Sequence, residues 1–324
     1  MEKIVILDTG YESYDYEQRL FGRHGYELII FERPVQSDLR IERAKEATGI
    51  LVRDTPVGLN ELDNMPNLKA IVRYGVGYDN IDVVEARDRG IRVANVQGYA
   101  NHAVSDHALA LMFACTRHLT GHRKEAFGKP MRKEMFELHN KTLGIIGIGR
   151  IGSQFSKKAS PLFERTLAFD PYKSGDYITG CKAEKVELAD LLQHSHIISL
   201  HCSLTDETRH MLDKTNFEMM AQRPVIINTS RGAVVDEAAL LNALDTGLVH
   251  SAGLDVFNQE PPGPEQEKLI SHPHVVSTPH IAWYSNEAIK TLQVRAADNM
   301  IGLLSGNQVD DELLDSFPGR YRLK

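Results

Sequence analysis

A glycine motif of the form G-x-G-x-x-G completes the sequence Thr142-Leu143-Gly144-Ile145-Ile146-Gly147-Ile148-Gly149-Arg150-Ile151-Gly152. The apolar residues 143–146 predict a buried strand, and residues 151–159 predict a helix. Gly147 permits a tight turn, Gly149 lets the backbone approach a phosphate, and Gly152 lets helix pack on strand. Alone, the motif also fits a glycine-rich turn. The flanking strand and helix favour a pyrophosphate bound at the helix N-terminus.

A carboxylate follows at the spacing that dinucleotide-binding folds use. A second strand, predicted at Arg165–Phe169, ends at Asp170, 18 residues after Gly152. An acid about 20 residues beyond the motif holds the ribose hydroxyls in such folds. A carboxylate there repels a 2′-phosphate, so we expect NAD rather than NADP. The nearby Lys173 fits a solvated surface lysine.

Composition and charge fit an ordinary globular protein. The 324 residues, 42% of them hydrophobic and 25% charged, suffice for two domains. A net charge of −7 without a basic run argues against a nucleic-acid partner. No apolar run approaches the roughly 18 residues of a membrane span, and the N-terminus lacks a signal-peptide pattern. The three distant cysteines, Cys115, Cys181 and Cys202, fit a reducing cytoplasm.

Short strands alternate with helix-length segments along both halves of the chain. This alternation predicts parallel sheets covered by helices, an α/β fold with two doubly wound domains. In the first half we expect strands at 4–7, 28–31, 49–52, 70–73 and 92–94, and helices at 16–24, 38–47 and 83–89. In the second half we expect six strands, at 143–146, 166–169, 196–200, 225–228, 251–254 and 275–277, and helices at 151–159, 186–192, 215–221 and 237–246.

Three segments connect or extend these halves. Residues 102–119 predict one long helix with Asn101 as its N-cap. Residues 120–139 are polar and mixed, and fit either a connector or a dimerisation arm. A last helix, at residues 286–304, has no sheet of its own and is expected to complete the first domain.

Candidate ligand-binding groups follow the predicted strands. Gly75 and Gly77 follow the fourth strand, where they fit a ligand loop as well as a plain turn capped by Asp79 or Asn80. The second half places Arg231, Asp255, Glu260 and His280 after its strands. Histidine can exchange a proton at the substrate oxygen, a carboxylate orients the imidazole, and arginine binds a carboxylate. The set suits a 2-oxo or 2-hydroxy acid, although each residue alone also fits a surface position.

Three histidines, His194, His196 and His201, suggest a metal cluster at first sight. Two of them flank the start of a buried strand, with no carboxylate or cysteine at ligand spacing. We therefore expect no metal site.

Taken together, the motifs resemble those of the D-isomer-specific 2-hydroxyacid dehydrogenase family over nearly the whole chain. They are, in chain order, Gly75–Asp82, Gly147–Gly152, Leu204–Thr208, Asn228–Gly232, Gly253–Phe257 and Thr278–His280. The resemblance implies that Arg231 binds and polarises the 2-oxo acid, that His280 is the acid/base, and that Glu260 is its carboxylate partner. It also implies a cofactor path along Gly147, Gly149, Arg150, Ile151, Gly152, Asp170, Thr205, Thr229, Ser230 and Asp255.

The resemblance further implies a discontinuous domain plan. A flavodoxin-like substrate domain takes residues 1–98 and 288–324, and a Rossmann NAD-binding domain takes residues 99–287. Such proteins are typically homodimers joined through the NAD-binding domains. The substrate would meet Arg53, Arg73, Tyr74, Gly75, Val76 and Gly77, with the backbone N–H groups of residues 75–77 on its carboxylate.

Two alternatives stay open within this resemblance. The placement of Arg53 and Arg73 is similar to that of the phosphate-contacting arginines of phosphoglycerate dehydrogenases, so the substrate could be a phosphorylated acid such as 3-phosphoglycerate. The segments 71–73 and 278–285 also resemble C-terminal-binding-protein corepressors, which are NAD-sensing scaffolds of this fold. In either case Trp283 fits stacking near the substrate or plain packing.

Overall fold

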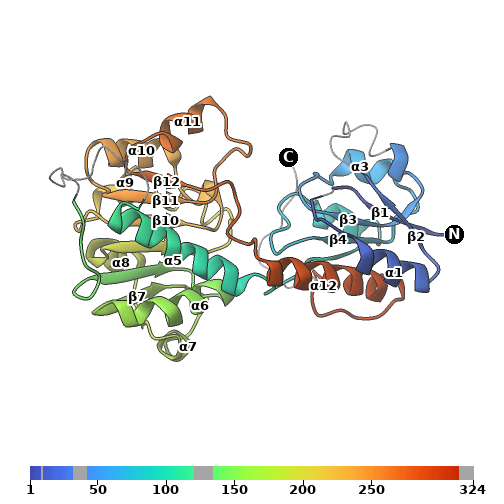
Figure 1. Cartoon of the computed structure of the whole chain (residues 1–324), viewed down its shortest axis with the longest axis horizontal. Helices are drawn as coiled ribbons and strands as arrows, with labels where there is room; N and C mark the ends of the chain where they lie inside the picture. Colours follow the sequence, from blue (N-terminus) through green and yellow to red (C-terminus); the bar gives the residue numbers. More distant parts are fainter. Residues whose placement is uncertain (9, 32–41, 120–133, 314–324) are drawn as a thin grey trace. The chain divides into compact units, whose positions relative to one another are not determined.

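The computed structural model describes residues 1–8, 10–31, 42–119 and 134–313 (Figure 1). The chain divides into two compact units: Met1–Tyr99 with Ser285–Lys324, and Ala100–Tyr284. We call them the N-terminal unit and the central unit. Each contains a parallel sheet with helices packed against it, so the expected fold class of two α/β domains is confirmed.

The N-terminal unit is built on five parallel strands in the order β2-β1-β3-β4-β5. This order is that of flavodoxin-like folds. The strand bounds are β1 Lys3–Ile6, β2 Glu27–Ile30, β3 Ala47–Val52, β4 Ala70–Arg73 and β5 Arg92–Ala94. Within the described residues, the helices of this unit are α1 Asp15–Arg23, α3 Leu59–Asp63, α4 Val83–Asp88 and α12 Asn286–Leu304, together with the helical residues 42–44.

Helix α12 returns to this first sheet, as its isolated position in the sequence predicts. It packs on β3, β4 and β5 and against α1. The approach is close at Gly49 of β3, where an added Cβ would lie 2.6 Å from the sulfur of Met300. All six residues of β3 are buried, which explains its continuous apolar run.

The central unit is built on seven parallel strands in the order β12-β11-β10-β9-β6-β7-β8. Six match the predicted set within one residue at each end: β6 Thr142–Ile146, β7 Arg165–Phe169, β9 Ile197–Leu200, β10 Val225–Asn228, β11 Ser251–Leu254 and β12 Val275–Ser277. The seventh, β8 Glu184–Lys185, was not predicted. Its two residues are exposed and charged, so it carries no apolar signal.

The helices of the central unit include α5 Asn101–Arg117, α6 Arg150–Ala159, α7 Gly175–Gly180, α8 Leu188–His194, α9 Lys214–Glu218, α10 Glu237–Asp245 and α11 Pro264–Ile270. Short 3-10 turns occur at Ser160–Leu162 and Gly232–Val234. The predicted cap of α5 is wrong, because Asn101 is its first helical residue and Ala100 takes the N-cap position. No helix in the described ranges has the length and apolarity needed to cross a bilayer.

Two predicted segments lie partly outside the described residues. For the helix expected at 38–47, residues 38–41 are outside, residues 42–44 are helical as predicted, and strand β3 already begins at Ala47. For the connector or arm at 120–139, residues 120–133 are outside. Within its described end, Phe136 and Leu138 pack against the core of the central unit.

Candidate active site

The glycine loop of the central unit joins β6 to α6, and each glycine meets a different constraint. Gly147 has a φ of 87°, and an added Cβ would lie 2.6 Å from the backbone nitrogen of Cys202. At Gly152 an added Cβ would lie 2.0 Å from the Gly147 carbonyl oxygen. At Gly149 nothing lies within 4 Å. Two glycines are therefore needed by the fold, and Gly149 leaves room over the N-terminus of α6, as a bound pyrophosphate requires.

Asp170 follows β7 and is tied to this loop. Its Oδ2 accepts a hydrogen bond from the Ile148 N–H at 3.0 Å, and its Oδ1 accepts one from the Tyr172 N–H at 3.0 Å. The carboxylate is 9% exposed. It fixes the glycine loop against β7, so it shapes the place where the resemblance puts the adenosine ribose.

Glu260 and His280 are 20 residues apart in sequence and directly paired. The His280 Nδ1 lies 2.5 Å from Glu260 Oε2, and Glu260 Oε1 accepts the Phe257 N–H at 3.0 Å. Burial alone would raise the pKa of Glu260, but the His280 contact, the Phe257 N–H and the positive charge of Arg231 lower it overall. Glu260 therefore stays a carboxylate near neutral pH and holds the imidazole through Nδ1, which leaves Nε2 for a substrate.

Asp255 anchors the loop that carries His280. Its Oδ1 accepts the Thr278 hydroxyl at 2.6 Å and the Ile281 N–H at 2.9 Å, and its Oδ2 accepts the Ala282 N–H at 2.9 Å. The Asp255 carbonyl also accepts the His280 N–H at 2.8 Å. His280 has a φ of 53°, in the left-handed region, and these bonds hold it there.

Two further residues support this loop. His107 of α5 places its Nε2 2.9 Å from the Thr278 hydroxyl, a contact that the sequence did not reveal. Trp283 donates from its indole N–H to the His280 carbonyl at 3.0 Å. The indole therefore braces the histidine backbone, which is closer to a packing role than to free stacking.

The Arg231 loop is shaped by Asn228 at the end of β10. Asn228 donates from Nδ2 to the Arg231 carbonyl at 2.9 Å, and its Oδ1 accepts the Ser230 N–H and hydroxyl. At Gly232 an added Cβ would lie 2.0 Å from the Phe257 carbonyl carbon, so glycine lets this loop pass the one that leads to Glu260. The Thr229 hydroxyl oxygen is buried without a hydrogen-bond partner in the described chain, as a group that awaits a cofactor would be. Thr205 bonds locally to Thr208.

In the N-terminal unit the Gly75 loop lies under an arginine. Gly75 has a φ of 144°, and an added Cβ would fall 1.4 Å from Nη1 of Arg73. Arg73 donates to the Tyr74 carbonyl at 2.7 Å. The Tyr74 ring is fully buried and its hydroxyl donates to Glu17, so Tyr74 can offer a substrate only its backbone. Val76 is exposed, and its carbonyl accepts the Asn95 amide at 2.6 Å.

The alternative for this loop was a plain turn capped by Asp79 or Asn80, but the cap is a different residue. The helix that follows, α4, is capped by Asp82, whose side chain accepts the Glu85 N–H at 2.9 Å. Asn80 instead donates to the Thr55 carbonyl at 2.9 Å. The Gly75–Gly77 segment is therefore a loop that precedes the cap by several residues.

Arg53 lies at the end of β3 and is paired with its neighbour. Its Nε and Nη2 donate to Asp54 Oδ2 at 2.8 and 2.6 Å. Burial by itself lowers the pKa of Arg53, but Asp54 outweighs this effect and raises it. Beneath the loop, Asp8 accepts the N–H groups of Arg53, Asp54 and Thr55 at 2.9 to 3.2 Å. Sequence reasoning missed both acids.

The suspected metal histidines have other surroundings. His201 is buried against Phe155, its Nε2 lies 2.9 Å from the Ser199 hydroxyl, and burial lowers its pKa to about 3. His196 accepts the Thr142 N–H at 3.2 Å. No group of three metal-ligating side chains occurs in the ranges that the structure describes.

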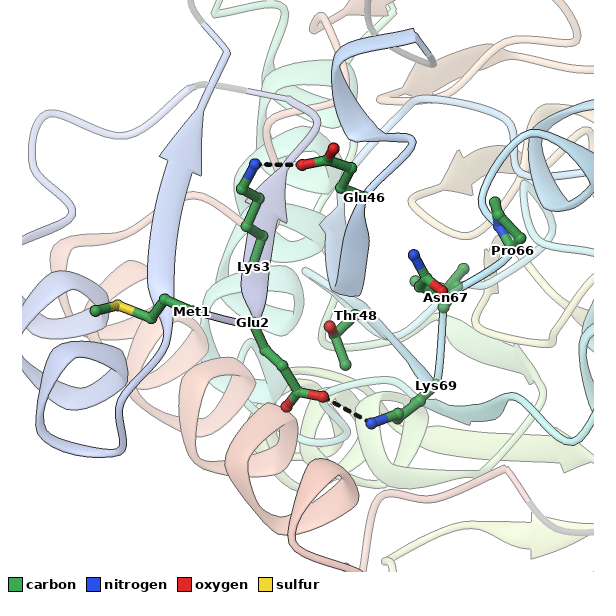
Figure 2. A pocket seen from close by; sticks show the side chains of 9 residues that line it. Met1, Glu2, Lys3, Glu46, Thr48, Pro66, Asn67 and Lys69 are labelled. Atoms are coloured by element: carbon green, nitrogen blue, oxygen red, sulfur yellow. Dashed lines mark hydrogen bonds and ion pairs between the residues drawn. The ribbon is translucent and has the colours of Figure 1, made fainter.

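A surface hollow in the N-terminal unit has none of these groups in its lining (Figure 2). It is lined by the amino ends of β1 and β3 and by the segment before β4. Its charges are matched in two ion pairs, Lys3 with Glu46 and Lys69 with Glu2. Ligands of parallel α/β sheets bind at the carboxyl ends of the strands, so we assign it no role.

Comparison with known proteins shows which family the chain belongs to. Residues 109–282 match the family model described as D-isomer specific 2-hydroxyacid dehydrogenase, NAD binding domain. Glyoxylate reductase of Korarchaeum cryptofilum is 36% identical over 90% of this chain and 91% of its own length. Hydroxypyruvate reductase of Thermotoga maritima is 37% identical over 85% and 90%. D-3-phosphoglycerate dehydrogenase of Archaeoglobus fulgidus is 34% identical over 94% of this chain but only 58% of its own length.

A solved structure shows the same likeness. D-lactate dehydrogenase of Aquifex aeolicus, complexed with NAD and lactic acid, has a TM-score of 0.84 at 26% identity, covering 94% of this chain and 96% of that one. The chain therefore belongs to the D-isomer-specific 2-hydroxyacid dehydrogenase family. It is an NAD-dependent oxidoreductase that acts on the CH–OH group of 2-hydroxy acids.

Proposed function

We propose that this enzyme reduces a small unphosphorylated 2-oxo acid, of the glyoxylate or hydroxypyruvate type, with NADH. The observation that carries this choice is the pairing of Arg53 with Asp54. A phosphate dianion needs uncompensated positive charge, and here the carboxylate of the adjacent residue already takes two guanidinium donors. The glyoxylate and hydroxypyruvate reductases among the relatives agree with this choice.

The proposed mechanism assigns a role to each residue of the central site. The nicotinamide, when bound, supplies the hydride. His280 gives a proton to the carbonyl oxygen, Glu260 orients the imidazole through Nδ1, and Arg231 steadies the charge that develops on that oxygen. The Gly75 N–H already donates to the Arg73 carbonyl at 2.9 Å, so the backbone N–H groups of Val76 and Gly77 would bind the substrate carboxylate. In the oxidation direction the proton moves back to His280.

The cofactor residues follow from the same loops. The glycine loop with Arg150 and Ile151 would hold the pyrophosphate, and the buried Thr229 hydroxyl and the Ser230 turn would border the nicotinamide half. Asp170 would take the ribose hydroxyls, so we expect NADH to be preferred over NADPH. Equal kcat/KM for the two cofactors would rule out this preference.

A substrate panel tests the proposal. Glyoxylate, hydroxypyruvate, pyruvate and 3-phosphohydroxypyruvate are each supplied with NADH, and kcat/KM is measured. We expect the unphosphorylated acids to be reduced fastest. His280→Ala should lower kcat by about 100-fold or more with NADH affinity unchanged, and Arg231→Ala should raise KM and lower kcat together. The exposed His24 at the end of α1, changed to Ala, is the control. Normal kcat in the His280 variant would refute the assignment.

A phosphorylated substrate is the second candidate, because Arg53 and Arg73 both lie at the carboxyl ends of strands near the Gly75 loop. If a phosphate displaces Asp54, Arg53→Ala should reduce turnover of 3-phosphohydroxypyruvate far more than that of glyoxylate. Equal losses would exclude this candidate. A corepressor-like scaffold would instead bind NADH tightly and turn over none of the acids.

We also propose a homodimer joined through the central units, in the cytoplasm. An apolar surface hollow of this unit includes Phe113, Phe136, Leu138 and Leu162, and the first and last of these are 37% exposed. Burying such a patch in a second copy would remove apolar surface from water. Free thiols at Cys115, Cys181 and Cys202 agree with a reducing compartment. Sedimentation at micromolar concentration should give twice 36.3 kDa, and a stable monomer would contradict the proposal.

A further inference from the structure

Tyr11, Tyr14 and Tyr74 of the N-terminal unit pack together above the end of β4. The Tyr11 ring meets Tyr14 at a centroid distance of 5.8 Å and Tyr74 at 5.3 Å, both edge to face. Tyr14 accepts the Gly10 N–H at 3.1 Å, and Tyr74 donates to Glu17 at 3.0 Å. The Tyr11 hydroxyl is buried and has no hydrogen-bond partner in the described part of the chain.

This hydroxyl lies on the ligand side of the sheet. Tyr11 follows β1, and its ring touches Tyr74, the residue before Gly75. Burial and the neighbouring Tyr99 raise the pKa of Tyr11, whereas the charges of Arg53 and Arg73 act in the opposite direction. The guanidinium groups of Arg53 and Arg73 lie over Gly10 and Gly75, the residues next to Tyr11 and Tyr74. The carboxyl ends of β1, β3 and β4 thus surround one unsatisfied donor.

An unpaired buried hydroxyl is costly for the free protein. A phenylalanine would fill the same space and keep both ring contacts without that cost. The hydroxyl is covered in this structure, so a partner must arrive with movement of a covering side chain. The two arginines beside it have long, rotatable side chains that permit such movement. A polar group of a ligand would supply the partner that the described residues do not.

We propose that the Tyr11 hydroxyl hydrogen-bonds an oxygen on C3 of the substrate and so selects 3-hydroxy-2-oxo acids over 2-oxo acids with an alkyl group. The inference rests on the proposed function, in which the Gly75 loop binds the carboxylate of the same substrate. Glyoxylate has no C3, so its turnover is independent of this contact. Pyruvate places a methyl group there and leaves the hydroxyl unpaired. A site built to bond a substrate hydroxyl discriminates strongly against the analogue that lacks it.

The test compares Tyr11→Phe with Tyr14→Phe, which removes a neighbouring hydroxyl that is already paired. For each, kcat/KM is measured for hydroxypyruvate, pyruvate and glyoxylate, and Tm is measured without ligands. In Tyr11→Phe we expect the hydroxypyruvate-to-pyruvate ratio to fall about tenfold or more, glyoxylate turnover to stay within about twofold, and Tm to stay or rise. In Tyr14→Phe we expect the ratio to stay and Tm to fall.

Two outcomes would overturn the inference: an unchanged ratio in Tyr11→Phe, or a parallel loss for all three acids together with a lower Tm, which would indicate a structural role. Failure of the proposed function is recognised separately, because the unmodified enzyme would then reduce none of the three acids.

Discussion

Replacing Asp255 by Asn should loosen the loop that carries His280. The carboxylate is 1% exposed and accepts hydrogen bonds from the Thr278 hydroxyl and from the N–H groups of Ile281 and Ala282. An asparagine side chain has almost the same shape but only one acceptor atom. Its best orientation keeps the oxygen on Thr278 and Ile281, and turns its NH2 group toward the Ala282 N–H.

The expected loss of unfolding free energy follows from these contacts. One hydrogen bond to a charged acceptor is lost, which costs about 1.5–3 kcal/mol, and the two that remain become weaker neutral bonds. The total is about 2–4 kcal/mol of unfolding free energy. For a unit of about this size, each kcal/mol lowers Tm by about 2–4 °C. Because the Asp255 carbonyl still binds the His280 N–H, the histidine is displaced rather than released, and we expect kcat to fall about 10- to 100-fold.

The chain contains its own reporter for this change. Trp283 is the one tryptophan in the sequence, and its indole N–H binds the His280 carbonyl. Guanidinium unfolding followed by tryptophan fluorescence therefore reports on this loop. Asp82→Asn is the matched control, because Asp82 is also buried and caps α4, where asparagine caps equally well. Wild-type emission and an unchanged midpoint in the Asp255 variant would refute this account.

Three further predictions concern the glycine loop and two titrating groups. Gly149→Ala should weaken NADH binding about tenfold or more at unchanged Tm. Gly152→Ala should instead lower Tm, because its added Cβ meets the Gly147 carbonyl. NADH titration and melting curves check both variants, and wild-type affinity in the Gly149 variant would contradict the phosphate site. Burial lowers the pKa of His201 to about 3 in the folded state, whereas the unfolded chain binds a proton below pH about 6.5. The free energy of unfolding therefore falls as pH drops below about 6.5, by up to about 1.4 kcal/mol per pH unit. In His201→Gln, the free energy of unfolding should depend less steeply on acid pH. Folding lowers the pKa of Glu260, so its contribution to the free energy of unfolding is present above the unfolded pKa and is lost as pH falls through the folded pKa. The difference in unfolding free energy between wild type and Glu260→Gln should therefore shrink in acid. A difference independent of pH would argue against the pairing with His280.

All described strands except β8 were readable from sequence, because each contains a short apolar run with clear ends. Strands β4, β5, β10, β11 and β12 have the predicted bounds. Helix ends were less certain, because propensity does not fix the last turn. Thus the helix predicted at 186–192 is α8 at Leu188–His194, after two residues that continue the extended chain from β8. Short helices such as α3, α7 and α11 were missed, because five to seven residues hold too little periodicity.

The sequence identified candidate site residues, but it did not identify the residues that hold their loops in place. The pattern and the family resemblance together pointed to Glu260 and His280, and the structure pairs them at 2.5 Å. Their roles remain proposals. The contact of His107 with Thr278 spans 171 residues, and no local pattern announces a partner at that distance. No sequence pattern points to the Tyr11 hydroxyl either, because it stands out only by having no hydrogen-bond partner among the described residues.

At the carboxyl-end edge of both sheets, a buried aspartate after a strand accepts hydrogen bonds from a neighbouring loop. This arrangement explains why these loops hold their shape. Asp8, Asp170 and Asp255 each lie just beyond the end of a strand, and each accepts N–H groups from the loop after the neighbouring strand. The neighbours are β1 with β3, β7 with β6, and β11 with β12. Beyond a strand end the ladder no longer pairs the backbone, and a buried carboxylate has enough acceptor sites to satisfy several of the N–H groups left over. Strand order therefore decides which loop each acid can fix, and the loops fixed in this way are those that carry Arg53, the glycine motif and His280.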